Sequence, residues 1–174
     1  MKQLEIIDNI SYFQEIVDYI KTTDLSKQQV MITTRTPDAD IYTDGIGGIG
    51  DYPEGTREPD WKYLNNVYKG TIIEKFYNDI NTVFPLGRLR IMNLQPKTCY
   101  GYHYDWRSMY PGASRNRIHL PILGDEDAFF VIEDEIFKMK YDGSLYNFNT
   151  CDVKHTFVNA SRENIRTHLV GVML

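Results

Sequence analysis

From Leu86 to its end, the chain is a series of short β-rich segments separated by turn residues, among which Gly and Asp recur. Eight such segments are expected, at residues 88–94, 100–106, 117–123, 128–133, 136–141, 144–149, 155–159 and 166–174. Strands that recur about every 8 to 12 residues predict a sandwich or a barrel, and eight of them suit a jelly roll of the cupin type. The sequence therefore predicts a mainly β fold, a double-stranded β-helix.

The first half of the chain has two amphipathic helical patterns, at residues 10–22 and 71–83, and one short strand pattern at 29–34. Each helical pattern begins with a capping-box pair, namely Ser11 with Gln14 and Thr71 with Glu74. A length of 174 residues suits a single domain. We expect a helical and loop part at about 1–85, whose helices cover one outer sheet face, and a jelly-roll core at about 86–174.

Composition and charge exclude several classes of function. The formal charge is −5 and no run of five basic residues occurs, so neither nucleic acid nor an anionic membrane surface is expected as a partner. No apolar run approaches the ~20 residues that span a bilayer, and the first residues lack the apolar stretch of a signal peptide. We therefore expect a cytoplasmic protein. Cys99 and Cys151 are too few for a disulfide framework or a thiolate zinc site.

Residues 36–60 are rich in turn formers, with five of the 12 glycines and three of the 7 prolines. The segment 45–50 fits the pattern G-x-G-x-x-G, but the residues after it, Asp-Tyr-Pro, cannot open a helix, so dinucleotide binding is not expected. Long loops in compact domains are often functional or mobile. We predict that residues 37–60 form a substrate lid, and a passive insertion is the alternative.

Three residues have the composition of a metal site. In a strand, His103 and Asp105 point to the same face, and His155 lies in a second β-rich segment. Two imidazoles and one carboxylate form the facial triad of non-haem Fe(II) oxygenases, which leaves positions open for a co-substrate and O₂. A buried histidine with a structural role is the alternative for His155. Four aromatic residues are expected on the face opposite His103, packed against the sheet: Tyr100, Tyr102, Tyr104 and Trp106.

Basic residues on neighbouring strands complete the set of candidates. Arg166 lies in an apolar segment, where an unpaired guanidinium would be costly, and its planar fork fits a carboxylate. Arg117 and His119 share one strand face and are predicted to look into the site, while the apolar residues that alternate with them meet the covering helices. The alternatives are an exposed strand end for Arg166 and a solvent-facing pair for Arg117 and His119.

Four motifs carry these residues: His103-x-Asp105, Arg117-x-His119-Leu120-Pro121, His155-x-x-x-Asn159 and Arg166-x-His168-Leu169. In this order the motifs resemble the aspartyl/asparaginyl β-hydroxylase family of Fe(II)- and 2-oxoglutarate-dependent oxygenases, which includes free-proline hydroxylases. The resemblance covers roughly residues 88–174. It implies that His103, Asp105 and His155 bind Fe(II), and that 2-oxoglutarate and O₂ are co-substrates.

The same resemblance implies a role for each of the other residues. Arg166 would clamp the distal carboxylate of 2-oxoglutarate, and Arg117 with His119 would lie near its other end. Asn159 would line the site. Aspartyl hydroxylases lack the carboxylate ligand, so the presence of Asp105 makes the chain more similar to the proline hydroxylases.

The implied activity is the hydroxylation of an amino acid, a peptide or a related small molecule, coupled to oxidation of 2-oxoglutarate to succinate. Two alternatives stay open, a non-catalytic cupin-like module that binds a metal or ligand, and a metal-dependent isomerase or hydrolase. Arg166 separates them, because a dicarboxylate clamp has no role in either alternative. Arg107, Arg115 and Arg162 are candidates for binding an acidic substrate, with solvated loop charges as the alternative. The oligomeric state is left open.

Overall fold

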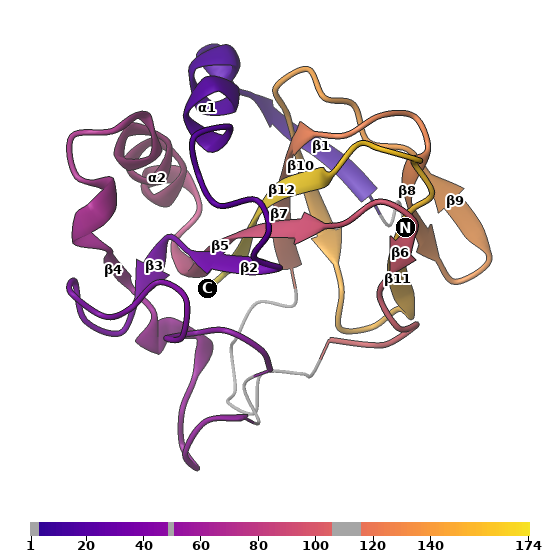
Figure 1. Cartoon of the computed structure of the whole chain (residues 1–174). Helices are drawn as coiled ribbons and strands as arrows, with labels where there is room; N and C mark the ends of the chain where they lie inside the picture. Colours follow the sequence, from indigo (N-terminus) through magenta and orange to yellow (C-terminus); the bar gives the residue numbers. More distant parts are fainter. Residues whose placement is uncertain (1–3, 49–50, 106–115) are drawn as a thin grey trace.

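The computed structural model describes residues 4–48, 51–105 and 116–174. Within these ranges the chain is mainly β, with strands in antiparallel sheets and two α-helices. The largest sheet has six strands in the order β1-β10-β7-β12-β5-β2 (Figure 1). In this order the strands span Leu4–Asn9, Ser144–Asn149, Asn116–Leu123, Arg166–Met173, Leu86–Leu94 and Gln29–Met31.

A four-stranded sheet has the order β6-β11-β8-β9. Its strands span Thr98–Cys99, His155–Asn159, Ala128–Ile132 and Glu135–Phe137. A two-stranded sheet joins β3 (Thr33–Thr34) to β4 (Tyr63–Leu64), and two short 3-10 helices span Glu58–Asp60 and Asn66–Tyr68. Side chains from both larger sheets meet in a buried cluster that includes Phe130, Phe148 and Phe157.

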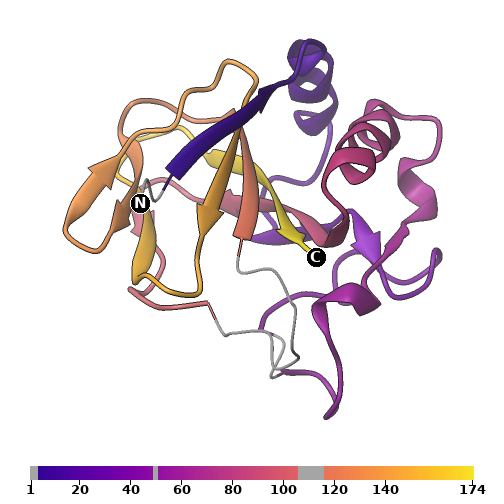
Figure 2. The same ribbon diagram turned by 180° about the vertical axis from the view of Figure 1, so that it is seen from behind.

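The two α-helices lie on one side of the six-stranded sheet, and the four-stranded sheet lies on the other (Figures 1 and 2). Helix α1 spans Phe13–Ile20 and α2 spans Ile72–Val83. Thr71 caps α2 by accepting a hydrogen bond from the backbone N–H of Ile73 at 3.2 Å, as the sequence predicts. The N-cap of α1 is Tyr12 and forms no side-chain cap, so the capping box expected from Ser11 was wrong.

The helices bury their apolar faces against this sheet. Ile16 and Ile20 of α1 and Ile73, Phe76 and Ile80 of α2 are buried in one core cluster. From the sheet, the cluster includes Leu89, Ile91, Ile118, Leu120, Ile122 and Leu169. Burying such a side chain fully contributes about 1.5 to 3 kcal/mol. The predicted alternation in β7 is confirmed, because its apolar residues meet the helices.

Three expected strands differ from the observed ones. Residues 29–34 form two strands in different sheets, because Gln29–Met31 pair with β5 whereas Thr33–Thr34 pair with β4. Within 100–105, His103 makes only an isolated bridge to β11, and the strand expected at 136–141 is the shorter β9. Strand β1, an edge strand beside β10, was not predicted.

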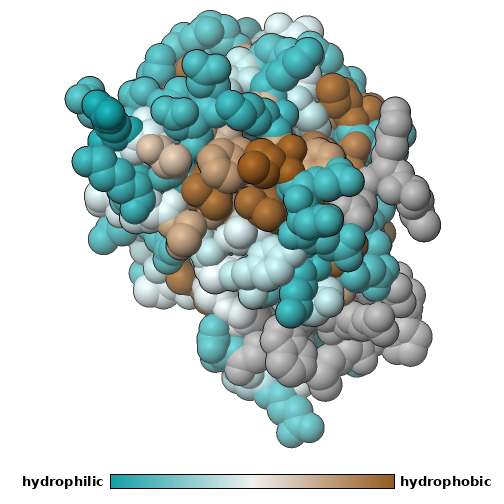
Figure 3. Space-filling view, turned by 90° about the vertical axis from the view of Figure 1, so that its right-hand side faces the viewer, coloured by the Kyte–Doolittle hydropathy of each residue, from teal (hydrophilic) through white to brown (hydrophobic). Residues whose placement is uncertain are grey.

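Among the described residues, no helix is both long enough and apolar enough to cross a membrane. The face of the molecule on the side of β8 and β9 carries a small group of apolar side chains within a largely hydrophilic surface (Figure 3).

Candidate metal centre

The structure brings His103, Asp105 and His155 together. Each offers one ligand atom, and the three atoms lie within 4.8 Å of one another. The backbones of His103 and His155 pair as an isolated antiparallel bridge, in which His103 N donates to His155 O at 3.0 Å and His155 N to His103 O at 2.8 Å. Asp105 follows two residues later, and its N–H donates to the carbonyl of Thr150 at 3.0 Å. Local backbone pairing therefore positions all three side chains.

Backbone carbonyls orient both imidazoles. The Nδ1 of His103 lies 2.6 Å from the carbonyl oxygen of Gly101, and the Nδ1 of His155 lies 3.2 Å from that of Val153. Because a carbonyl can only accept, each Nδ1 carries a proton, and in the neutral form of each imidazole Nε2 keeps a lone pair for a metal ion. The Nε2 of His155 is buried and has no hydrogen-bond partner among the described residues. This orphaned acceptor, beside a second imidazole and a carboxylate, fits Fe(II).

Electrostatics keep the carboxylate ionised. Burial raises the pKa of Asp105, but its hydrogen bond with His103 and the charge of Arg117 more than offset this, so the pKa lies well below the usual range. The Oδ2 of Asp105 accepts from Nε of Arg117 at 3.2 Å. Burial lowers the pKa of His155, which favours the neutral ligand form. The hydrogen bond to Asp105 raises the pKa of His103, so a proton competes there with a metal ion.

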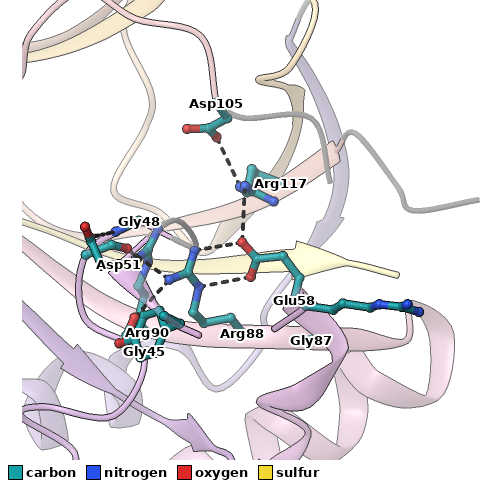
Figure 4. Close-up of polar contacts among 12 residues, drawn as sticks. Gly45, Gly48, Asp51, Glu58, Gly87, Arg88, Arg90, Asp105 and Arg117 are labelled. Carbon is teal, nitrogen blue, oxygen red and sulfur yellow. Dashed lines mark hydrogen bonds and ion pairs between the residues drawn. The ribbon is translucent and has the colours of Figure 1, made fainter. Parts of the chain in front are cut away.

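A cavity of about 310 Å³ lies beside the triad, with His103 and Asp105 on its wall. A network of buried charges borders it (Figure 4). Arg88 holds Glu58 through two hydrogen bonds, from Nε to Oε2 at 3.0 Å and from Nη2 to Oε1 at 2.7 Å. Arg117 lies between Glu58, at 3.9 Å, and Asp105, at 3.2 Å. The network thus connects the 37–60 segment to the carboxylate of the triad.

Arg166 is buried against two aromatic rings, with its guanidinium carbon 4.9 Å from the ring centroids of Phe130 and Phe157, which themselves lie 4.2 Å apart. Its Nη2 lies 3.1 Å from Nδ1 of His168. No ion pair links it to a carboxylate within the described ranges. Burial lowers the pKa of Arg166 to about 10, so the group stays protonated at neutral pH. Arg166 itself does not line the cavity in the described part of the chain, but Phe157 does.

His119 and Arg117 both line the cavity, as the strand alternation predicts. Burial, followed by the charge of Arg166, holds the pKa of His119 well below its usual range. Both ring nitrogens of His119 are buried without a hydrogen-bond partner in the described ranges. The imidazole is therefore neutral and offers one donor and one acceptor to a ligand.

The remaining candidates either are not among the described residues that line the cavity or lie outside the described ranges. Asn159 donates to the carbonyls of Leu94 and Asn164, both at 2.9 Å, and is not among the described residues that line the cavity. Arg162 is exposed, while Trp106, Arg107 and Arg115 lie outside the described residues.

Tyr100 and Tyr104 line the cavity, so the expectation that they face away from His103 was wrong. The reason is that residues 100–105 do not form a regular strand, and side chains there do not alternate strictly. Tyr102, in contrast, is exposed.

Several residues on the cavity wall were not predicted as site residues, among them Gln29, Glu58, Arg88 and Arg90. Arg88 and Arg90 alternate with apolar residues along β5, which is the same signal that marked Arg117 and His119. Glu58 gives no comparable signal, because it lies in the turn-rich 37–60 segment. Gly47 and Gly48 of this segment also line the cavity. The lid itself stays a prediction.

No protein-family model and no curated protein matches the chain. Among solved structures, the viral collagen prolyl hydroxylase of Paramecium bursaria Chlorella virus-1, in a 2OG complex, is 12% identical over 99% of this chain and 97% of that chain, with a TM-score of 0.49. A 2OG-Fe(II) oxygenase family oxidoreductase of Burkholderia pseudomallei is 20% identical over 62% of this chain and 52% of its own, with a TM-score of 0.41.

A conserved protein of unknown function from Streptococcus pyogenes is 16% identical over 50% of this chain, with a TM-score of 0.35, and this chain spans 64% of its length. The chain thus spans less than two thirds of this protein and of the Burkholderia one. Structures with such low identities and TM-scores do not indicate a reaction for this chain. The resemblance to the aspartyl/asparaginyl β-hydroxylases therefore stays a prediction, and the chemistry has to be inferred from the side chains of the site.

Proposed function

We propose that the protein is an Fe(II)- and 2-oxoglutarate-dependent dioxygenase that hydroxylates an amino acid, a peptide or a related small molecule. One observation carries the proposal. His103, Asp105 and His155 lie together beside a cavity, with both Nδ1 atoms held by backbone carbonyls, so that the neutral imidazoles offer both Nε2 atoms to a metal ion. Two imidazoles and a carboxylate are the donor set of the facial triad, which would leave coordination positions open.

The sheet topology supports a double-stranded β-helix for the scaffold. From β5 to β12 the chain passes repeatedly between the two larger sheets: β5, β7, β10 and β12 belong to one, and β6, β8, β9 and β11 to the other. This winding is expected of a jelly roll. It also brings His103 and His155 onto neighbouring backbone segments, joined by one isolated bridge.

When bound, Fe(II) would supply the redox chemistry by which O₂ converts 2-oxoglutarate and a substrate C–H group into succinate, CO₂ and a C–OH group. The residues of this chain bind and orient the reactants. Arg117 fixes one oxygen of Asp105 and leaves Oδ1 on the side of His103 Nε2, 3.5 Å away. The rings of Phe130 and Phe157 lie beside Arg166 and exclude water from its charge.

Arg166 favours the oxygenase over a module that only binds a metal. A buried guanidinium without a carboxylate partner is costly, and a dicarboxylate co-substrate would offset that cost through a bidentate pair. His119, neutral and unpartnered, is close enough to the same aromatic cluster to meet the ligand, since its ring centroid lies 5.2 Å from that of Phe130.

The proposal is tested with purified protein under anaerobic conditions. Addition of Fe(II) and then 2-oxoglutarate should produce a weak visible charge-transfer band that neither produces alone. Admission of O₂ should then release succinate, slowly without a substrate and faster when a panel of amino acids or peptides contains one. Absence of both the band and succinate would refute the assignment and leave the non-catalytic module.

A further inference from the structure

Arg90 lies on the cavity wall. On β5 it stands opposite Val170 of β12, and Val170 in turn stands opposite His119 of β7. Neighbours in register point to the same side of a sheet, and all three residues line the cavity. Arg166 lies four residues before Val170 on β12, which is about 13 Å along the strand. The two arginines therefore occupy different levels of the same sheet face.

Among the described residues, only one nitrogen of the Arg90 guanidinium has hydrogen-bond partners. Its Nη1 donates to Oε1 of Gln29 at 3.0 Å and to the carbonyl of Gly47 at 3.5 Å. Within the described ranges, Nε and Nη2 have no hydrogen-bond partner and the side chain forms no ion pair. The sequence has no Asp or Glu outside those ranges. Nε and Nη2 form the edge of a guanidinium that binds a carboxylate through two parallel hydrogen bonds.

Arg88, two residues earlier on the same face, is an arginine whose guanidinium already binds a carboxylate. Its Nη1 donates to the carbonyls of Gly45 and Gly47, both at 3.0 Å, while its Nε and Nη2 hold both oxygens of Glu58. Arg90 is similar on the side of Nη1, which also donates to the carbonyl of Gly47. What Arg90 lacks is the carboxylate.

The charges around the cavity point to an anionic ligand as well. The described residues that line the cavity include three arginines, Arg88, Arg90 and Arg117, and two carboxylates, Glu58 and Asp105. Both carboxylates are engaged by arginines other than Arg90. Burial, and then the charges of Arg88 and Arg117, lower the pKa of Arg90 to about 9, which still leaves it protonated at neutral pH. A positive charge in this position is stabilised by an anion that enters the cavity.

We propose that Arg90 binds a carboxylate of the prime substrate through Nε and Nη2, and that the substrate is therefore a small carboxylic acid rather than a neutral or cationic molecule. This inference rests on the proposed function and names the substrate class of the same site. Gln29 and Gly47 orient the guanidinium through Nη1. Arg166 is left to the co-substrate.

The test compares the wild type with Arg90→Gln, which removes the charge, and Arg90→Lys, which keeps the charge but loses the fork. Arg162→Gln is the matched control, because Arg162 is exposed and is not among the described residues that line the cavity, which favours a solvated loop charge over a substrate ligand. Each protein is first titrated anaerobically with 2-oxoglutarate in the presence of Fe(II). It is then exposed to a panel of amino, hydroxy and keto acids, each paired with its amide, and both thermal stabilisation and succinate release are measured.

We expect at least one acid, and not its amide, to stabilise the wild type and to stimulate succinate release. In Arg90→Gln the concentration of that acid needed for half of the effect should rise roughly ten- to a hundredfold, while the affinity for 2-oxoglutarate stays unchanged. Arg90→Lys should recover only part of the loss, and Arg162→Gln should behave as the wild type.

Three results would overturn the inference: no acid of the panel binding better than its amide, an Arg90→Gln variant with unchanged acid affinity, or one with weakened 2-oxoglutarate binding. Failure of the proposed function looks different. In that case the wild type itself gives neither the 2-oxoglutarate-dependent band nor succinate. Equal melting temperatures of wild type and variants in buffer exclude a folding defect.

Discussion

Replacing Arg166 by lysine isolates the geometry of its guanidinium from its charge. In the structure the guanidinium lies 4.9 Å from two ring centroids and contacts Nδ1 of His168 at 3.1 Å, which leaves the rest of the fork for a ligand. An ammonium group keeps the positive charge but cannot form two parallel hydrogen bonds with one carboxylate. The substitution Arg166→Lys should therefore remove one charge-assisted hydrogen bond from the pair that we propose between Arg166 and 2-oxoglutarate.

Such a bond contributes about 1.5 to 3 kcal/mol, which corresponds to a roughly ten- to a hundredfold weaker affinity for 2-oxoglutarate. The affinity is measured by anaerobic equilibrium dialysis with labelled 2-oxoglutarate in the presence of Fe(II). Arg162→Lys, the same change at an exposed position four residues earlier, serves as the control and should have no effect. An Arg166→Lys variant that binds 2-oxoglutarate as tightly as the wild type would show that the co-substrate carboxylate lies elsewhere.

Two further predictions concern stability. Glu58→Gln breaks the buried ion pair with Arg88, in which the Glu58 side chain is 7% exposed and the Arg88 side chain 4%. It should lower the free energy of unfolding, measured in urea, by about 3 to 5 kcal/mol, and a loss below about 1 kcal/mol would contradict a stabilising buried pair. Hydrogen bonds from Ser161 and Asn164 lower the pKa of Asp125 below its usual 3.8, so its contribution is complete above that value and is lost as the pH falls below it. Melting curves of wild type and Asp125→Asn should therefore differ at about pH 6, and the difference should shrink as the pH falls below 3.8, whereas a constant difference would argue against this linkage.

The parts of the fold that follow local rules could be predicted from the sequence. Strand alternation correctly put Arg117 and His119 on the inner face of β7, and Thr71 capped α2 as expected. Strand β1 could not be predicted, because it is an edge strand whose side chains are mostly exposed and which depends on backbone pairing with β10. The region 100–105 was predicted as a strand from its aromatic residues, but only His103 pairs with β11.

Some residues of the candidate site could likewise be predicted from the sequence, and others could not. His103, Asp105 and His155 were predicted from residue type and spacing, and a single backbone bridge brings the two histidines together. The pair of Arg88 and Glu58 joins residues 30 positions apart, one of them in a segment without a periodic pattern. Nothing in the local sequence indicates that pairing, so the chemical environment of Arg88 and Arg90 emerges only in three dimensions.

The metal content of the protein tests the central claim most directly. Wild-type protein, equilibrated anaerobically with Fe(II) and passed over a desalting column, should retain one iron per chain. His155→Ala should retain none, because it removes the buried Nε2 that has no other partner among the described residues. His168→Gln, a change at a buried histidine outside the triad, should retain the iron. Stoichiometric iron in His155→Ala, or none in the wild type, would contradict the account.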